Sequence, residues 1–361
     1  EPRDPDDVIF INYTSGSMGF SKGVMLPYRA LWGNIDYVLK CLAPNVKPGS
    51  NLVSILPMAH MYGLAVEFLF GFINGCHLYF LNRMPSPSLI AEAFAEVKPR
   101  LIVAVPLVIE KIIRRKVLAE VQTNRMKLLL NMPVINKKIK QHIRDRIMEA
   151  FGGNAFEIIV GGAPLNQGIE EFLNSVGVPV TIGYGTTETA PLITFANYDK
   201  YKIASCGPVV DHMEAKVVSP DPANVPGELI ARGMNVMLGY YKNEEATNAV
   251  LDKDGWFHTG DLATMAPSGH IYIKGRIKNM LLGANGQNVY PEEIEDKLNN
   301  MPLVGESIII QRDTKLIALV HPEIEDKEAM DFDDDDVKGI MAENLKTLNN
   351  QLPPFCKIAA I

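Results

Sequence analysis

The sequence is poor in cysteine and has no long uninterrupted apolar segment, and both features limit what the chain can be. Its four cysteines, Cys41, Cys76, Cys206 and Cys356, are far apart and form no Cys-x-x-Cys pair. A disulfide framework and a zinc site are therefore disfavoured, and a reducing cytoplasmic environment is expected. No apolar run approaches the roughly 20 residues that a membrane-spanning helix needs, and no charged-then-apolar leader is present.

The chain also lacks an excess of positive charge. It carries 35 Lys and Arg against 42 Asp and Glu, a net charge of −7 over 361 residues. Nucleic acid is therefore not an expected partner, and membrane contact is expected to be peripheral at most, at the inner membrane face. With 47% hydrophobic and 21% charged residues, the chain has the composition of a folded protein with two or more cores.

The first two thirds of the chain alternate between short β-rich runs and segments with helical periodicity. Residues 8–13 predict a buried strand, and from Tyr28 onward Leu31, Ile35, Val38, Leu39 and Leu42 fall on one helical face. Further strands are predicted over 51–56, 77–81, 100–105, 156–162 and 178–185, and they alternate with helices predicted over 63–73, 88–97, 107–150 and 166–176. Repeated strand–helix–strand units predict a mainly parallel sheet covered by helices on both faces.

The pattern changes after about Ser205, where strands and turns replace the alternation. Strands are predicted over 227–233 and 269–275, and from Arg276 a smaller α+β unit follows. We therefore predict an α/β protein whose large domain, residues 1–277, holds the parallel sheet and a β-rich subdomain. A small α+β domain, residues 278–361, completes the chain. Its acidic cluster, Asp331 and Asp333 to Asp336, is expected to be a solvated helix N-terminus rather than a metal site.

The densest group of glycines and small hydroxyl residues is YTSGSMGFSKGV, residues 13–24. Glycine lets backbone N–H groups converge on an anion, and Lys22 adds a point charge for a polyphosphate. The segment is not a Walker A loop, because Ser21 precedes Lys22 where that motif needs glycine, and a strand-like segment follows. We predict a phosphate-binding loop between two extended segments. The alternative, a flexible hairpin turn, does not explain the neighbouring hydroxyls of Thr14, Ser15 and Ser17.

Three later segments carry further candidate residues. GGAPL, residues 161–165, and GYGTTET, residues 183–189, each end a predicted strand, and open α/β sheets bind ligands at that edge. The turn WFHTGD places Asp261, a carboxylate that can accept both hydroxyls of a ribose. The segment LPMAHMYG places His60 ahead of an apolar helix.

Taken together and in this order, the motifs resemble those of the adenylate-forming superfamily, which includes acyl-CoA synthetases, luciferases and adenylation domains. By this resemblance Tyr184 stacks on adenine, Thr187 contacts the α-phosphate and Glu188 holds Mg²⁺. Four residues are expected to take part in catalysis: Lys22, Thr187, Glu188 and, at the carboxylate site, His60. The resemblance assigns further nucleotide contacts to Thr14, Ser15, Gly16, Ser17, Gly19, Gly161, Gly162, Ala163, Gly183, Gly185 and Thr186.

The resemblance extends to the C-terminal part of the chain. It implies that Asp261 and Arg276 contact the ribose, and that Lys278 is the hinge about which a mobile C-terminal domain rotates. Gly283 and Gly286 resemble the loop that lines the pantetheine tunnel after that rotation. Lys357 lacks the glycine that precedes the family's catalytic lysine, and the chain ends before such a Gly-Lys motif. Because it also opens without methionine, we expect a fragment that binds ATP or AMP and adenylates poorly.

Residues 156–191 and the basic helical insert 111–153 look most like bacterial long-chain acyl-CoA synthetases. The implied function is ATP-dependent activation of a fatty acid to acyl-AMP and then acyl-CoA, with ATP or AMP, Mg²⁺ and coenzyme A bound. Alternatives are a ligase for other acyl or aryl acids, an acyl-AMP ligase that loads a carrier protein, and a catalytically impaired nucleotide-binding module. The sequence leaves the oligomeric state open, with a homodimer as one candidate. The chain departs from the family pattern at Met18, Ser21 and Asn279.

Overall fold

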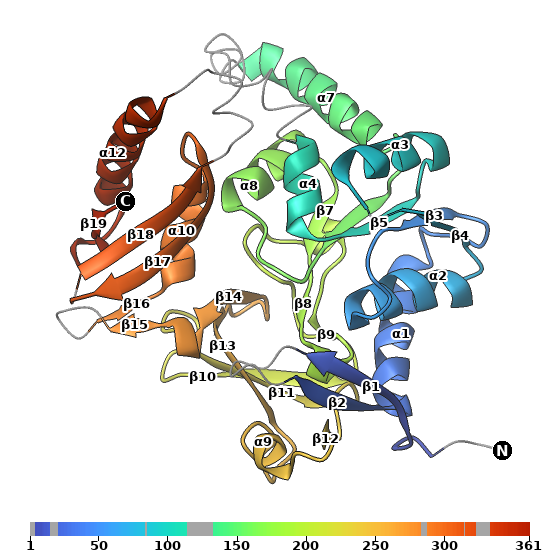
Figure 1. Ribbon diagram of the computed structural model, residues 1–361. Coiled ribbons are helices and arrows are strands. Elements are labelled where there is room, and N and C mark those ends of the chain that lie inside the picture. The colour runs from blue at the N-terminus through green and yellow to red at the C-terminus, as the bar shows by residue number, and fades with distance from the viewer. Residues whose placement is uncertain are drawn as a thin grey trace.

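A five-stranded parallel sheet forms the centre of the molecule (Figure 1). In this computed structural model the described residues are 4–14, 21–83, 85–113, 133–282, 287–313, 315–322 and 333–361. The sheet has the strand order β4–β3–β5–β6–β7, and every neighbouring pair is parallel. Its strands are β3 (Asn51–Ser54), β4 (His77–Phe80), β5 (Leu101–Ala104), β6 (Glu157–Val160) and β7 (Val180–Ile182). The predicted parallel sheet is confirmed.

Helices lie on both faces of this sheet (Figure 1). They are α1 (Tyr28–Leu42), α2 (Phe70–Ile73), α3 (Pro87–Val97), α4 (Pro106–Ile113), α7 (Pro133–Ala150) and α8 (Gln167–Val176). In α1 the predicted apolar face is buried at Leu31, Ile35, Val38 and Leu42. Because the sheet is covered on both sides, every residue of β5 and β6 is buried. The middle of the predicted helical region 107–150, residues 114–132, lies outside the described residues.

The first predicted strand is present but it is not buried, so that part of the prediction is wrong. Strand β1 (Val8–Thr14) is the edge of a three-stranded sheet with β2 (Lys22–Pro27) and β12 (Gly239–Tyr240). Tyr13 is 64% exposed, whereas Val24 and Leu26 of β2 are in the core. The apolar composition of β1 indicated a strand correctly, but the strand contributes only partly buried side chains such as Ile9, whereas its neighbour β2 contributes fully buried ones.

Two other elements differ in detail from the predicted ones. The apolar helix begins with a π-helical segment, Gly63–Leu69, in which the N–H of Phe70 donates to the carbonyl of Ala65. The strand predicted over 178–185 is divided, because β7 ends before Gly183 and β8 (Tyr184–Gly185) pairs with another strand, β9 (Leu192–Thr194).

A four-stranded antiparallel sheet builds the β-rich part of the large unit. Its order is β10–β11–β13–β14. The strands are β10 (Met213–Val218), β11 (Gly227–Gly233), β13 (Phe257–Met265) and β14 (Ile271–Arg276), and the short helix α9 (Glu244–Asn248) lies between β12 and β13 in sequence.

The C-terminal segment has a separate apolar core, made by residues that include Val289, Ile294, Leu298, Leu316, Leu348 and Ile358. Its elements are β15 (Leu281–Leu282), β16 (Asn288–Val289), α10 (Pro291–Asn299), β17 (Val304–Arg312), β18 (Lys315–Pro322), α12 (Asp334–Gln351) and β19 (Ile358–Ala360). The α/β class with a β-rich part and an α+β end is thus observed, and the domain boundary near Lys278 stays a prediction.

The described part of the acidic cluster caps a helix, as expected. The side chain of Asp333 accepts hydrogen bonds from the backbone N–H groups of Asp335 and Asp336 at the start of α12. Among the described residues, no group of three or more His, Cys, Asp or Glu side chains is arranged to hold a metal ion. Nor does any described helix combine the length and apolar character needed to cross a bilayer.

Candidate functional site

The predicted phosphate loop closes a β-hairpin. Strands β1 and β2 pair antiparallel, and Thr14 lies opposite Lys22 in the register. Extended segments therefore flank the loop on both sides, as the sequence predicted. The predicted loop contacts Ser15, Gly16, Ser17 and Gly19 lie outside the described residues.

Lys22 and Glu188 both contact the side chain of one tyrosine, Tyr240. The Lys22 ammonium nitrogen is 4.7 Å from the centroid of the Tyr240 ring. The Tyr240 hydroxyl donates a 2.8 Å hydrogen bond to Oε1 of Glu188. Sequence analysis missed Tyr240, because it occupies a two-residue strand and belongs to none of the glycine-rich motifs. Only its long-range pairing with β2 brings it here.

Glu188 projects from a short 3-10 turn, Thr187–Thr189, which directly follows β8. The backbone N–H of Thr186 donates to the Thr189 hydroxyl at 3.1 Å and fixes the start of this turn. Within the described chain, Oε2 of Glu188 accepts no hydrogen bond, and Thr187 is partly exposed beside it. One carboxylate oxygen is thus held in place, and the other can bind a ligand.

Tyr184, Asp261 and Arg276 form a second cluster, which the resemblance assigned to the adenosine. The Tyr184 hydroxyl donates to Oδ2 of Asp261 at 2.6 Å, and Nε of Arg276 lies 3.3 Å from Oδ1. Burial raises the pKa of the Asp261 carboxyl, the Tyr184 hydrogen bond and Arg276 oppose the rise, and the charge of Glu188 adds to it. The two clusters therefore influence each other electrostatically.

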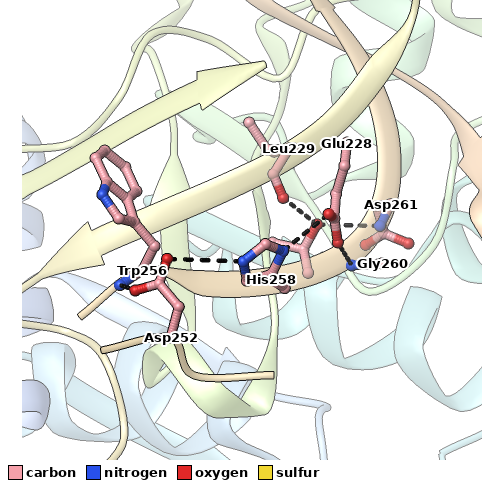
Figure 2. Close-up of polar contacts among 8 residues, drawn as sticks. Glu228, Leu229, Asp252, Trp256, His258, Gly260 and Asp261 are labelled. Atoms are coloured by element: carbon pink, nitrogen blue, oxygen red, sulfur yellow. Dashed lines mark hydrogen bonds and ion pairs between the residues drawn. The ribbon is translucent and has the colours of Figure 1, made fainter. Parts of the chain in front are cut away.

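Asp261 lies within strand β13 rather than in the turn predicted from the sequence, and this part of the strand is fixed to β11 (Figure 2). The Thr259 hydroxyl accepts the Asp261 N–H at 3.0 Å and donates to the carbonyl of Leu229 at 2.6 Å. The Glu228 carboxylate accepts the N–H of Gly260 at 3.2 Å. Gly260 has φ +70°, a left-handed conformation that favours glycine. These contacts hold the backbone on both sides of the Asp261 carboxylate.

His258 contacts the other oxygen of the same Glu228 carboxylate. Its Nδ1 lies 2.9 Å from Oε2 of Glu228, and its Nε2 lies 3.9 Å from the Asp252 carboxylate (Figure 2). Asp252 is itself anchored, because it accepts the backbone N–H of Trp256 at 2.9 Å. A chain of polar contacts thus links the start of β13 to β11.

The glycine-rich segment after β6 lies beside the segment after β7. The N–H of Gly183 donates to the carbonyl of Val160, the last residue of β6. Gly161, which follows Val160, packs on Tyr62, and a side-chain carbon at Gly161 would lie 3.1 Å from that ring. Gly162 and Ala163 are exposed at the same edge. The two segments therefore meet at the carboxyl end of the sheet, as predicted.

His60 lies on an exposed turn, and a buried acid holds the start of that turn. Glu67, which is 1% exposed, accepts hydrogen bonds from the Ser54 hydroxyl and from the N–H groups of Ile55 and Leu56. Burial raises the pKa of Glu67 to about 7, and the three donors oppose this rise. Within the described residues, the His60 side chain makes no hydrogen bond or ion pair with either cluster.

A hollow of about 370 Å³ lies between β1 and the turn that carries His60. It is lined by Phe10, Ile11, Asn12, Tyr13, Met58, Ala59 and Leu64. Leu64 belongs to the apolar helix that the resemblance assigned to the acyl pocket. The hollow is thus mostly apolar and adjoins the strand that enters the phosphate loop.

The predicted hinge residue, Lys278, is exposed in a short turn, Ile277–Asn279, between β14 and β15. Beside it, the Asn279 side chain donates to Oε1 of Glu292 at 2.7 Å. The N–H of Gln167 also donates to the Asp296 carboxylate at 3.1 Å, which joins α8 to α10. The C-terminal unit therefore contacts the large unit in this arrangement. Gly283 and Gly286 lie outside the described residues.

Comparison with known sequences identifies proteins that are similar to this chain. A family model for AMP-binding enzymes matches residues 1–241. A long-chain-fatty-acid–CoA ligase of Escherichia coli O6:H1 is 34% identical over 310 residues, which cover 84% of this chain and 50% of that protein. Long-chain-fatty-acid–CoA ligase 1 of Saccharomyces cerevisiae is 28% identical over 89% of this chain and 49% of that protein. The chain thus spans about half the length of these curated relatives.

Solved structures give a consistent comparison. ATP-bound MatB from Rhodopseudomonas palustris matches with a TM-score of 0.77 and 28% identity, over 99% of this chain and 65% of that chain. O-succinylbenzoate coenzyme A synthetase (MenE) from Bacillus subtilis, in complex with ATP and magnesium ion, matches with a TM-score of 0.72 over 99% of this chain and 66% of that chain. At 22% identity, the second likeness concerns the fold alone.

Proposed function

The chain belongs to the family of AMP-binding enzymes, as its motifs indicated, and from this membership we propose that its protein joins a carboxylic acid to coenzyme A through an acyl-adenylate. The substrate we favour is a long-chain fatty acid. The observation that carries the proposal is the meeting of two clusters at the segment Tyr184–Glu188, which follows the last strand of the parallel sheet. Lys22 and Glu188 share Tyr240, while Asp261 contacts Tyr184 and Arg276 and is affected by the charge of Glu188.

The donor set around Glu188 fits Mg²⁺. A carboxylate is a hard oxygen ligand, and Mg²⁺ is commonly bound by one or two carboxylates together with substrate phosphates and water. Oε1 of Glu188 accepts from Tyr240, and Oε2 is left for the ion. When bound, Mg²⁺ would neutralise part of the charge on the phosphates.

In the first half-reaction a carboxylate oxygen attacks the α-phosphorus of ATP, forming acyl-AMP and releasing pyrophosphate. The barrier arises largely because two anions approach each other, so the contribution of the chain is electrostatic and positional. Lys22 and the loop amides would hold the phosphates, and Thr187 would contact the α-phosphate. Asp261 and Arg276 would fix the ribose, with Tyr184 against the base. His60 would border the carboxylate.

In the second half-reaction the coenzyme A thiolate attacks the acyl carbonyl and displaces AMP. We propose that the C-terminal unit turns about Lys278 between the two steps, a hinge motion between rigid units. The contacts at Asn279 and Gln167 would then be exchanged for others. Gly283 and Gly286 would line the path of the pantetheine arm.

The preference for a long alkyl chain is supported by two observations. The curated relatives named above are long-chain-fatty-acid–CoA ligases. The hollow beside His60 is bordered by apolar side chains, which include Phe10, Met58 and Leu64, and such a surface favours an alkyl chain over a charged acid.

The test is carboxylate-dependent exchange of labelled pyrophosphate into ATP, measured on the protein as its gene encodes it. Fatty acids of graded length, malonate and an aryl acid are compared. We expect exchange that rises with chain length. Exchange with malonate or the aryl acid alone would replace the fatty acid with another acid, and nucleotide binding without any exchange would favour a binding module. Product formation with coenzyme A, rather than with a carrier protein, distinguishes the ligase from an acyl-AMP ligase.

A further inference from the structure

The segment 237–241 contacts both the turn that carries Glu188 and strand β2, which carries Lys22. At one end, the N–H of Met237 donates to the carbonyl of Glu188 at 2.8 Å. At the other end, the N–H of Tyr241 donates to the carbonyl of Gly23, the residue after Lys22, at 2.7 Å. Both the Glu188 turn and strand β2 are therefore fixed to this short segment.

The side chain of Tyr240 makes the same connection between the charged groups themselves. Its ring faces the Lys22 ammonium at 4.7 Å, within the range of a cation–π contact, and its hydroxyl donates to Glu188 at 2.8 Å. Tyr240 is only 5% exposed. Burial and the nearby Glu188 raise the pKa of this phenol, so it stays protonated and remains a donor at neutral pH.

Tyr240 is itself held by the backbone and by Thr247. Its N–H donates to the Thr247 hydroxyl at 2.8 Å. The preceding residue, Gly239, has φ +140°, and a side-chain carbon there would lie 2.7 Å from Thr247. The strand thus enters its pairing with β2 through a position that only glycine fits well. A tyrosine side chain fixed in this way can hold both charged groups in position.

A shared partner for Lys22 and Glu188 matters because the two side chains have opposite charges and could otherwise form an ion pair with each other. Within the described chain they form no ion pair. A direct pair would occupy the ammonium that the phosphates need and the carboxylate that the metal needs. Because the Tyr240 ring face holds the ammonium and its hydroxyl holds Oε1 of Glu188, both groups share a partner that takes up neither the ammonium donors nor Oε2.

We propose that Tyr240 is a positioning residue for ATP activation: it keeps Lys22 and Glu188 apart and oriented, one toward the phosphates and the other toward the metal. This inference rests on the proposed function. It assigns two separable tasks to one side chain, since the hydroxyl orients Glu188 and the ring face orients Lys22.

Two substitutions separate these tasks. Tyr240→Phe keeps the ring and removes the hydroxyl, whereas Tyr240→Leu removes both. The measurements are the affinities of the chain for ATP with and without Mg²⁺ and for AMP, by calorimetry. For Tyr240→Phe we expect the enhancement of ATP binding by Mg²⁺ to fall about tenfold, as for a lost hydrogen bond to a charged group. AMP affinity should stay within about twofold. Tyr240→Leu should also weaken ATP binding without Mg²⁺, by about threefold, as for a lost cation–π contact.

Tyr241→Phe is the matched control, because Tyr241 is 44% exposed, its ring contacts Lys242 rather than Lys22 or Glu188, and the substitution keeps its N–H bond to Gly23. It should bind both nucleotides like the wild type. Thermal unfolding of each variant separates folding defects from binding defects, and Tyr240→Phe keeps the test valid if Tyr240→Leu does not fold.

Each result has a distinct meaning. Unchanged Mg²⁺ enhancement in Tyr240→Phe, or an equal loss for AMP and ATP, would overturn the positioning role and leave the proposed function standing. Absence of Mg²⁺-dependent ATP binding in the wild type would instead overturn the proposed function, together with the inference that rests on it.

Discussion

At the scale of single residues, buried carboxylates show how the site region is organised. Asp261 is 5% exposed and receives the Tyr184 hydroxyl and Arg276. Glu67 is 1% exposed and, in the part of the chain that the structure describes, has three donors but no cation. Because hydrogen bonds from neutral groups offset desolvation only partly, Glu67 retains a pKa of about 7.

The raised pKa of Glu67 predicts a dependence of stability on pH. Its pKa goes from 4.5 to about 7 on folding, so between these values the folded chain binds more protons than the unfolded chain. The stability contribution of this group therefore increases as the pH falls from 7 to 4.5. Relative to Glu67→Gln, the wild type should gain up to about 3 kcal/mol of unfolding free energy over this range, at about 1.4 kcal/mol per pKa unit. Equilibrium denaturation at several pH values measures the difference.

The comparison with Glu67→Gln is necessary because the Glu157 carboxyl, also buried, has its pKa raised to about 7 as well. Both proteins contain Glu157, so its effect cancels in the difference. A difference between wild type and Glu67→Gln that does not vary with pH would contradict the assignment to Glu67.

At the scale of elements, local patterns predicted most strands and helices, and tertiary pairing decided the remainder. The spacing of Leu31, Ile35 and Val38 predicted α1, because a helix needs one continuous apolar face. The burial of β1 could not be predicted, since exposure at a sheet edge depends on partners elsewhere in the chain. Tyr240 was missed for the same reason, because its position in β12 depends on the pairing of that two-residue strand with β2.

Substitution of two glycines near the turn that carries Glu188 should change the stability of the chain to different extents. A side-chain carbon at Gly185 would overlap the carbonyl oxygen of Pro191 across the β8–β9 pair, whereas at Gly183 the nearest atom is a Phe195 side-chain carbon at 3.4 Å. Gly185→Ala should therefore lower the free energy of unfolding by about 3 kcal/mol or more, and Gly183→Ala by less than about 1 kcal/mol. Denaturant unfolding checks both. Equal losses would show that the close approach of β8 and β9 is not what requires glycine.

At the scale of the whole molecule, the chain brings distant segments together. The hairpin β1–β2, the turn after β8, the strand β12 and the β13–β14 pair carry the residues of the two clusters, although they are separated in sequence by up to about 250 residues and belong to different sheets (Figure 1). The motifs pointed to the segments that carry Lys22, Glu188, Tyr184, Asp261 and Arg276, since each has recognisable glycines and polar residues, and their role as a nucleotide site stays a prediction. The motifs could not predict distances, or the tyrosine that links the clusters.

The most direct test of this account is a crystal structure of the chain with ATP and Mg²⁺. We expect the base beside Tyr184 and Gly161, the ribose on Asp261, the phosphates near Lys22, and the ion on Glu188. A nucleotide bound elsewhere, or bound with its phosphates away from both Lys22 and Glu188, would contradict the central claim that these turns form one ATP site.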